Sequence, residues 1–119
     1  MFKQKLERAV KHVDGALGCL LIGFDGIQID SVFRNDEMIE MGAIAVEVSN
    51  LLGNFRRLEL QDIGAVKEVS LTAGHITTLA HVIGDEYLLI LAIDADNGNI
   101  DRGQAMLRLI APSLELAVA

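Results

Sequence analysis

The residues most suggestive of chemistry lie in a short acidic stretch near the C-terminal end of the sequence. It contains the residue types that supply oxygen ligands to calcium: Asp94, Asp96, Asn97, Gly98, Asn99 and Asp101. A calcium loop that began at Asp94 would need its glycine where Asn99 stands and its bidentate glutamate where Ala105 stands. The spacing therefore excludes this kind of site, and we expect a turn in which Asn99 caps a following helix.

Other side chains that commonly do chemistry are few and far apart. His75 and His81 fall on one face of a predicted strand, but six residues of about 3.3 Å each separate them by about 20 Å, too far to share a metal. Cys19 is the only cysteine and lies in an apolar run, so we expect a buried thiol. The sequence contains neither the P-loop pattern G-x-x-x-x-G-K-[ST] nor the nucleophile elbow G-x-S-x-G. We therefore expect no catalytic residues, no metal and no cofactor.

Charge and hydropathy exclude several classes of partner. The formal net charge is −7 at pH 7, so the surface on average repels a phosphate backbone and nucleic acid is not expected as a partner. No apolar run approaches the roughly 18 to 20 residues that cross a bilayer, and the N-terminus lacks an apolar core of signal-peptide length. We expect a cytoplasmic protein without membrane insertion. Its 119 residues are enough for a single domain over residues 1–119.

The first half of the sequence predicts a helix and two unlike strands. Apolar residues at helical spacing within residues 2–13 indicate a first helix. Residues 17–24 are apolar throughout, which is typical of a central strand covered on both faces. Residues 27–34 alternate, which is typical of a half-exposed edge strand. The Asp25-Gly26 pair between the two runs predicts a type I′ hairpin turn.

The second half predicts a long helix, three strands and a last helix. The long helix is expected from about residue 37 to 58, with Asp36 as its cap. The strands are predicted at residues 66–72, 76–83 and 87–93. The last helix follows Asn99 and is expected to kink or stop early at Pro112. The resulting order, α-β-β-α-β-β-β-α, predicts an α+β fold with a five-stranded, largely antiparallel sheet and helices on both faces.

The long helix carries more apolar surface than one sheet covers. At about 100° per residue, its apolar or small side chains occupy about 220° of the circumference, whereas a helix facing one core shows a little over 100°. The bulky side contains Met41, Ile44, Val48, Leu51, Leu52 and Phe55, and the slim side contains Gly42, Ala45, Ser49 and Gly53. One side can pack on the sheet, and the other predicts the same helix of a second copy across a twofold axis. The alternative is that the first or last helix covers the surplus.

Three stretches of the sequence carry a family resemblance. They are GALGCLLIGFDGIQIDS, EMIEMGAIAVEVSNLLGNF, and EYLLILAID before the final helix. With the order of elements, they resemble the Roadblock/dynein light-chain family over essentially the whole chain. The resemblance implies the Roadblock fold and a homodimer in which the third strands join edge to edge, with the long helices packed antiparallel on one face. The interface residues it implies are Ile44, Val48, Leu51, Leu52, Phe55, Val66, Glu68, Val69, Ser70, Leu71 and Thr72.

The resemblance also implies binding rather than catalysis. The family's prokaryotic members regulate or scaffold small Ras-like GTPases, as the gliding-motility GTPase-activating protein does, and its eukaryotic members are dynein light chains and GTPase-platform subunits. We therefore expect a non-catalytic homodimer that binds such a GTPase and modulates its GTP hydrolysis or localisation. The expected docking surface is the polar sector of the long helix, which contains Glu40, Glu47, Asn50, Asn54 and Arg57.

The sequence also bears on the mode of regulation and on two alternative functions. Activators of GTPases often donate an arginine, and the candidates here are Arg34, Arg56 and Arg57. An arginine at a helix end is more often solvated or paired with the helix dipole. We expect instead that the dimer stabilises one conformation of the GTPase's own catalytic groups. The alternatives are a pure assembly adaptor of dynein-light-chain type without effect on GTP turnover, and a small-molecule sensor domain.

Overall fold

The elements follow the order that the sequence predicts. The computed structural model describes residues 2–34, 38–57 and 64–118, without the side chains of residues 38–40 and 57. The elements are α1 (Phe2–His12), β1 (Ala16–Gly23), β2 (Gln28–Phe33), α2 (Met38–Arg57), β3 (Glu68–Ala73), β4 (Ile76–Ile83), β5 (Tyr87–Asp94) and α3 (Ile100–Val118). This confirms the α-β-β-α-β-β-β-α order. The expected cap of α2, Asp36, lies outside the described residues.

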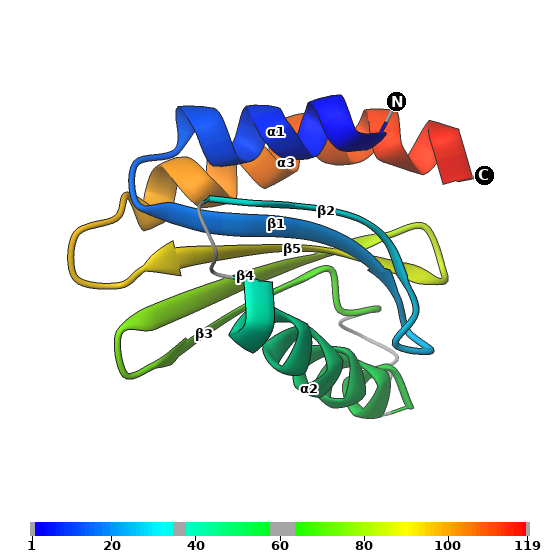
Figure 1. Ribbon diagram of the computed structural model, residues 1–119. Helices are drawn as coiled ribbons and strands as arrows, with labels where there is room; N and C mark the ends of the chain where they lie inside the picture. The colour runs from blue at the N-terminus through cyan, green and yellow to red at the C-terminus, as the bar shows by residue number, and fades with distance from the viewer. Residues whose placement is uncertain (1, 35–37, 58–63, 119) are drawn as a thin grey trace.

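The five strands form one antiparallel sheet in the order β2-β1-β5-β4-β3 (Figure 1). The two apolar strands, β1 and β5, pair with each other inside the sheet, where Leu20 lies opposite Ile90. The alternating strand β2 is at one edge and β3 is at the other. The prediction that apolar runs are central and that the alternating run is an edge is therefore confirmed.

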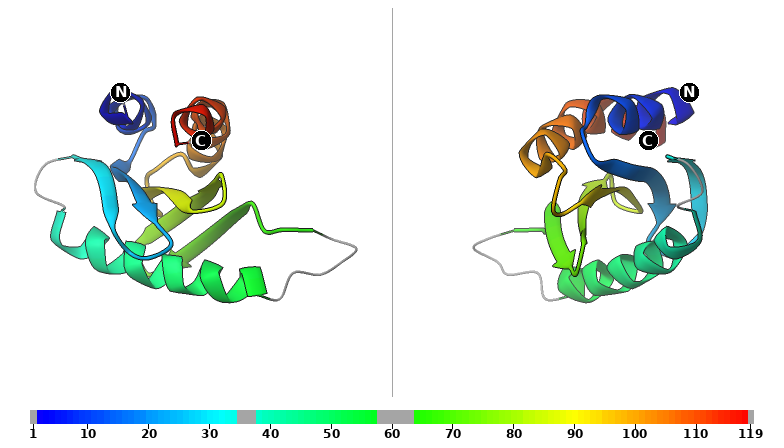
Figure 2. Two further views of the ribbon diagram at one scale, coloured as in Figure 1. Left: turned by 90° about the vertical axis from the view of Figure 1, so that its right-hand side faces the viewer. Right: turned by 60° about the vertical axis from the view of Figure 1, so that its left-hand side comes forward.

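Helices cover the sheet on both faces (Figure 2). α1 and α3 lie side by side on one face, and α2 lies alone on the other. Because successive strand residues point to opposite faces, Leu21 packs in the cluster that contains Leu6 and Leu107, whereas Leu20 packs in the cluster that contains Leu52. This two-sided cover explains why β1 has no polar side chain. Among the described residues, no helix has the length and apolar character needed to cross a membrane.

Two local predictions are corrected. The turn between β1 and β2 is a three-residue loop rather than a two-residue type I′ turn, because Gly23 donates its N–H to the Ile27 carbonyl. Gly26 ends this loop with a positive φ of 86°. The Asp25 carboxylate accepts the Ile27 N–H at 3.0 Å and holds this loop. The early stop expected at Pro112 is wrong, since α3 continues to Val118. The fully buried Leu114 in its last turns gives that continuation a packing reason.

Candidate functional site

α2 touches its own sheet through one narrow stripe. The stripe consists of Met41, Ala45, Val48 and Leu52, each at most 4% exposed. Val48 and Leu52 were predicted at the dimer interface; both pack in the cluster between α2 and its own sheet and expose almost no surface, and their contact with a second copy stays a prediction. The division of the helix into bulky and slim sides fails, since the stripe mixes both sizes. On the slim side, a Cβ added at Gly42 or Gly53 would meet no atom within 4 Å.

One flank of α2 is left uncovered beside the edge strand β3. Ile44 is half-buried, and Leu51 and Phe55 are 38% and 51% exposed. Across from them Leu71 of β3 is 44% exposed. An apolar groove of about 470 Å³ lies between the helix and the strands β3 and β4, and its lining residues are Ala43, Ile44, Glu47, Val48, Leu51, Leu71, Ala73, Ile76 and Thr78. We call it the α2–β3 groove.

The edge of β3 has backbone groups available for another strand. Val82 donates its N–H to the Lys67 carbonyl at 2.8 Å, so the alternation of an antiparallel ladder turns the backbone groups of Glu68, Ser70 and Thr72 away from β4. The side chains of β3 divide between the faces, since Val69 packs in the α2 cluster while Glu68 reaches toward α3. Val66, which was predicted in this strand, lies before its first residue.

The opposite edge, β2, is partly blocked. Arg34 donates its N–H to the Leu17 carbonyl, so the same alternation turns the backbone of Ser31 outward. The Asp30 carboxylate accepts the Ser31 N–H at 2.8 Å and lies 3.8 Å from the Lys3 ammonium. Capping an outward N–H with a charged side chain is one way in which proteins blunt an edge. The two edges of this sheet therefore differ, and β3 is the more open.

The predicted docking sector lies on the outer surface of α2. Glu47, Asn50 and Asn54 are exposed there, opposite the stripe that packs on the sheet. The side chains of Glu40 and Arg57 lie outside the described residues.

The two described arginine candidates contact other groups of their own chain. The Arg34 guanidinium donates to the Val10 carbonyl, and the Arg56 guanidinium lies 4.3 Å from the centre of the Phe24 ring.

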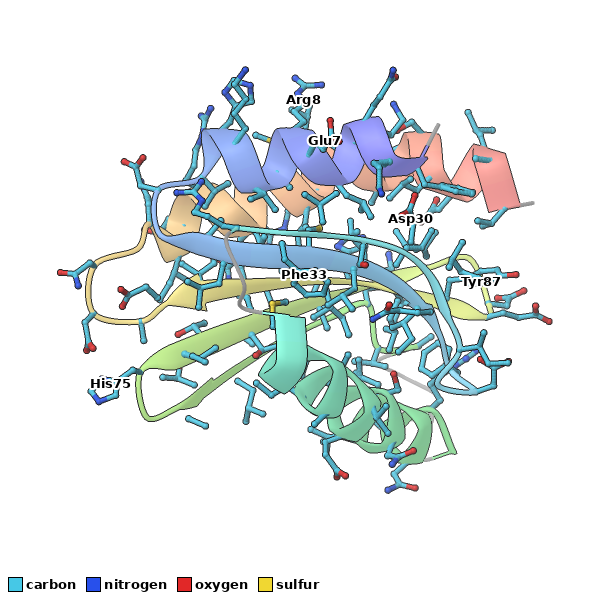
Figure 3. The ribbon with its side chains drawn as sticks, in the orientation of Figure 1. Glu7, Arg8, Asp30, Phe33, His75 and Tyr87 are labelled. Atoms are coloured by element: carbon cyan, nitrogen blue, oxygen red, sulfur yellow. The ribbon has the colours of Figure 1, made fainter. Side chains whose placement is uncertain are left out.

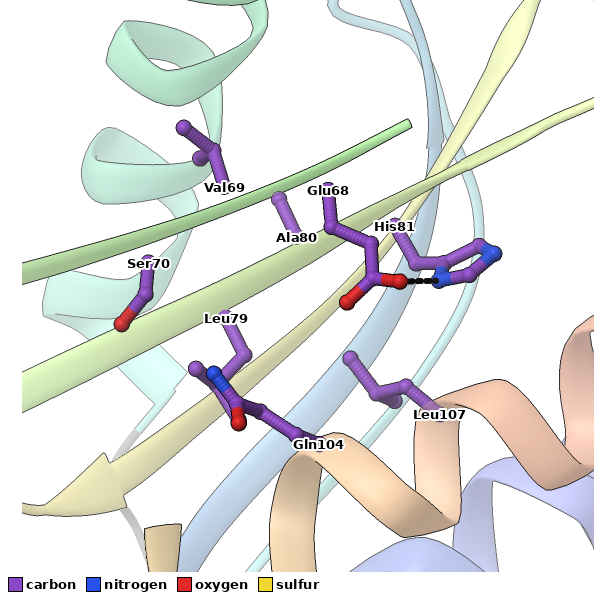
Figure 4. Close-up of a pocket in the computed structure, with 8 residues that line it drawn as sticks. All are labelled: Glu68, Val69, Ser70, Leu79, Ala80, His81, Gln104 and Leu107. Atoms are coloured by element: carbon purple, nitrogen blue, oxygen red, sulfur yellow. Dashed lines mark ion pairs between the residues drawn. The ribbon is translucent and has the colours of Figure 1, made fainter. Parts of the chain in front are cut away.

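A small polar pocket lies on the other face, between β3, β4 and α3 (Figure 4). Its volume is about 130 Å³. Glu68 accepts hydrogen bonds from Arg108 Nε and Nη2 at 2.9–3.1 Å, and these bonds lower the pKa of its carboxyl. His81 Nδ1 lies 3.9 Å from Glu68 Oε2 and is buried without a hydrogen bond in the described part of the chain. Ser70 points away from His81 (Figure 4), so the cluster holds no nucleophile beside a base. Its evident role is to tie β3 to α3.

Comparisons with known proteins agree with this architecture. Neither a protein-family model nor a curated protein matches the sequence. A Roadblock/LC7 domain from Streptomyces avermitilis has the same fold, with a TM-score of 0.71 and 16% identity over 93% of this chain and 95% of its own. MglC from Myxococcus xanthus is 32% identical over 98% of both chains, with a TM-score of 0.74. The chain belongs to the Roadblock/dynein light-chain family. The gliding protein MglB from Thermus thermophilus has the same Roadblock fold, with a TM-score of 0.81 and 16% identity over 95% of this chain and 84% of its own.

The acidic stretch at one end of this Roadblock domain forms a turn. Asn99 accepts the Arg102 N–H at 3.0 Å, which confirms the predicted helix cap. Asp94 accepts the backbone N–H groups of Asp96 and Asn97, and these bonds lower the pKa of its carboxyl. His75 Nδ1 lies 2.6 Å from Asp96 Oδ2. Within the described ranges, no three His, Cys, Asp or Glu side chains are grouped so that they could hold a metal ion. On β1, burial raises the pKa of the Cys19 thiol, as suits a packing residue.

Two of the three histidines of this Roadblock domain, His75 and His81, should affect stability in opposite directions as the pH changes. Burial lowers the pKa of His81 below its usual 6.5, against the weaker opposite effect of Glu68. The unfolded chain therefore binds this proton more readily, so the contribution of His81 to the free energy of unfolding should be constant above about pH 6.5 and fall as the pH drops from there to the folded-state pKa. We expect His81→Leu to flatten this fall, measured by urea unfolding at about pH 7.5 and about pH 5.

His75→Gln is the matched control. Hydrogen bonding to Asp96 raises the pKa of the exposed His75, so any stability from this pair is present at low pH and is lost as the pH rises through the folded-state pKa. A variant lacking His75 should therefore keep the acid-induced loss of stability. An unchanged pH profile in His81→Leu would show that His81 does not cause that loss.

Proposed function

We propose that this Roadblock protein, acting as one domain over residues 1–119, is a non-catalytic cytoplasmic homodimer that binds a small Ras-like GTPase and modulates its GTP hydrolysis or its localisation. The observation that carries the proposal is the α2–β3 groove, an apolar surface beside a strand edge with free backbone groups. Exposed apolar surface of this kind marks an interaction site on a protein of this size. Membership of the Roadblock family supports the choice of a GTPase as partner.

A second copy suits the groove and the strand edge together. Around a twofold axis, β3 of each chain would pair through the outward backbone groups of Glu68, Ser70 and Thr72. The same operation brings the open flank of each α2 toward the other, so that Leu51 and Phe55 lose their exposure. Leu71 and Val69 lie on the α2 side of the strand, so the paired helices would cover them. One symmetric contact would thus cover both features, as expected for a closed dimer.

The docking surface for the GTPase is the outward face of the paired α2 helices. Glu47, Asn50 and Asn54 are exposed on it, and the dimer would present this set twice, together with Glu40 and Arg57. The engagement of Arg34 and Arg56 with their own chain supports a passive mechanism. In that mechanism the bound protein stabilises one conformation of the GTPase and donates no residue to its active site.

Two measurements with small Ras-like GTPases of the source organism test the proposal: the affinity of this protein for the GTPase, and the rate of GTP hydrolysis by the GTPase when this protein is present. We expect Glu47→Arg with Asn50→Arg to weaken binding at least about tenfold, because the pair reverses charge and adds bulk at the centre of the surface. Glu7→Arg, an exposed substitution on α1 at the other face of the sheet, is the matched control and should leave binding unchanged. The triple variant Arg34→Ala, Arg56→Ala, Arg57→Ala should change the rate of hydrolysis less than about threefold.

Each alternative predicts a different outcome of the same assay. A fall in hydrolysis of about 10³-fold in the triple arginine variant, with binding intact, would contradict the passive mechanism. Binding without any change in GTP turnover would favour the pure assembly adaptor. No binding to any of these GTPases would contradict the proposal and leave the small-molecule sensor as the next candidate.

A further inference from the structure

Apart from Val46 of α2, which does not line a groove described above, the large apolar side chains that are exposed in the described part of the chain fall in three places. One group surrounds the α2–β3 groove, and Leu109 and Leu116 lie on α3. The third group is Ile27 and Ile29, at 64% and 44% exposed, where the β1–β2 loop leads into β2. The sheet order puts these two isoleucines at the edge opposite to β3. A dimer formed through β3 would therefore leave them uncovered.

Two turns and the end of α2 build a groove around these isoleucines. Gly23 of β1 pairs with Tyr87 of β5, and Phe24 donates its N–H to the Glu86 carbonyl at 2.9 Å, so the β1–β2 and β4–β5 turns lie side by side. Figure 3 labels Tyr87 at this end of the sheet, far from His75 at the other end. The groove has a volume of about 410 Å³, and its lining residues are Gly23, Phe24, Asp25, Ile27, Ile29, Arg56, Asp85, Glu86 and Tyr87. We call it the hairpin groove.

The rim of the hairpin groove is acidic. Asp25, Asp85 and Glu86 are exposed on the two turns. Glu115 of α3 lines an adjoining hollow of about 380 Å³ that shares Asp85 and Glu86 with the groove. Among the lining residues, Arg56 is the one cation, and its guanidinium lies over the Phe24 ring. The carboxylates therefore exceed the positive charge around an apolar floor.

We propose that the hairpin groove is a docking site for a protein segment that carries lysine or arginine side chains beside a large apolar side chain. The apolar side chain would cover Ile27 and Ile29, and the cations would lie against the carboxylates of Asp85 and Glu86. Charge complementarity of this kind selects partners and speeds their association. The same acidic rim repels nucleic acid and anionic lipid. Because each chain has its own groove, a dimer would offer two such sites.

A defined peptide tests the site without a known partner. The probe is a fluorescein-labelled peptide of four Lys-Leu-Ser repeats, and the matched peptide has Glu in place of each Lys. We expect the lysine peptide to shift the backbone amide resonances of residues 23–29 and 84–87 and to bind at least about tenfold more tightly than the glutamate peptide. Its affinity should fall as salt is added, because the carboxylates are exposed. Equal binding of the two peptides, or shifts confined to another face, would overturn the proposal.

Variants separate the apolar floor from the acidic rim. Ile27→Ser with Ile29→Ser, and Asp85→Asn with Glu86→Gln, should each weaken binding of the lysine peptide about tenfold. Leu109→Ser is the matched control on α3, since it also replaces an exposed large apolar side chain by serine, and it should leave the affinity unchanged. The exposed positions of all these residues favour retained folding, which the amide spectra check. Unchanged affinity in both double variants would overturn the proposal.

The peptide-binding test of the hairpin groove can fail or succeed independently of the test of the proposed homodimer. Leu51→Asp, which targets the α2–β3 groove, should leave peptide affinity unchanged whether or not the protein dimerises. A mass in solution that rises beyond a dimer with concentration, and that Ile27→Ser with Ile29→Ser reduces to a dimer, would assign the hairpin groove to another copy of this chain. That result would overturn the proposal of a different protein as occupant.

Discussion

Replacing Leu51 by aspartate should convert the proposed dimer into a folded monomer. The side chain is 38% exposed in one chain, so a carboxylate there reaches water as long as the chain is alone. In the proposed dimer the same position faces the partner's α2, and an unpaired charge would be buried. Losing a leucine at an interface centre and burying a charge together cost several kcal/mol, so we expect the dissociation constant to rise about 10³-fold.

Light scattering measures this result directly. The native chain should give about twice the mass of one chain, 12.9 kDa, and Leu51→Asp should give the mass of one chain at the same concentration. Leu109→Asp is the control, because Leu109 is 59% exposed on α3 and lies on the other face of the sheet. It should remain a dimer. A native monomer would remove the doubled GTPase-docking surface from the proposed function, and an unchanged dimer in Leu51→Asp would move the interface elsewhere.

The sequence predicts the layers of this fold well, because the spacing of apolar residues along a strand depends on which of its faces are buried. A run such as residues 88–93 of β5, apolar at every position, can be stable only between two covering layers, and the structure has helices on both sides of it. The alternation of β2 likewise predicts an edge. These inferences depend on neighbours along the chain, whose relative directions are fixed by strand geometry.

The rotation of α2 about its axis could not be predicted in the same way. Helical spacing gives the angles between side chains but not which side faces the sheet. Dividing the residues by size placed Val48 and Leu52 with Leu51, whereas the structure buries the first two and leaves Leu51 at the surface. The α2 cluster contains Ala45 beside larger residues, so the side of the helix that packs depends on the sheet as well as on side-chain size. That information is absent from the helix itself.

The polar pocket and the hairpin groove depend on contacts between distant parts of the chain. Glu68 meets Arg108 from another helix, and no motif connects them. Ile27 and Ile29 are recognisable as alternating residues of a strand. The position of Arg56 beside them follows only from the path of α2 across the sheet. The sequence therefore indicates some of the residues of the polar pocket and of the hairpin groove, but it does not show which distant residues lie beside them.

The burial of Leu52 predicts a large loss of stability that is independent of dimerisation. Leu52 is fully buried in the α2 cluster, which also contains Leu20 and Ile90. Replacing it by alanine removes buried methyl groups and leaves a cavity, so we expect Leu52→Ala to lower the free energy of unfolding by about 2–5 kcal/mol. Leu109→Ala deletes the same atoms from an exposed site and should change it by less than about 0.5 kcal/mol.

Both substitutions are best measured in the Leu51→Asp chain. In a dimer, dissociation contributes to the apparent stability and depends on protein concentration, whereas a monomer reports the packing of α2 on its own sheet. Urea unfolding then gives the two free energies under identical conditions. A large loss for Leu52→Ala would confirm that this side chain packs inside the chain. An effect as small as that of Leu109→Ala, combined with a halved mass when Leu52→Ala is made in the native chain, would return Leu52 to the interface and mean that α2 is rotated about its axis.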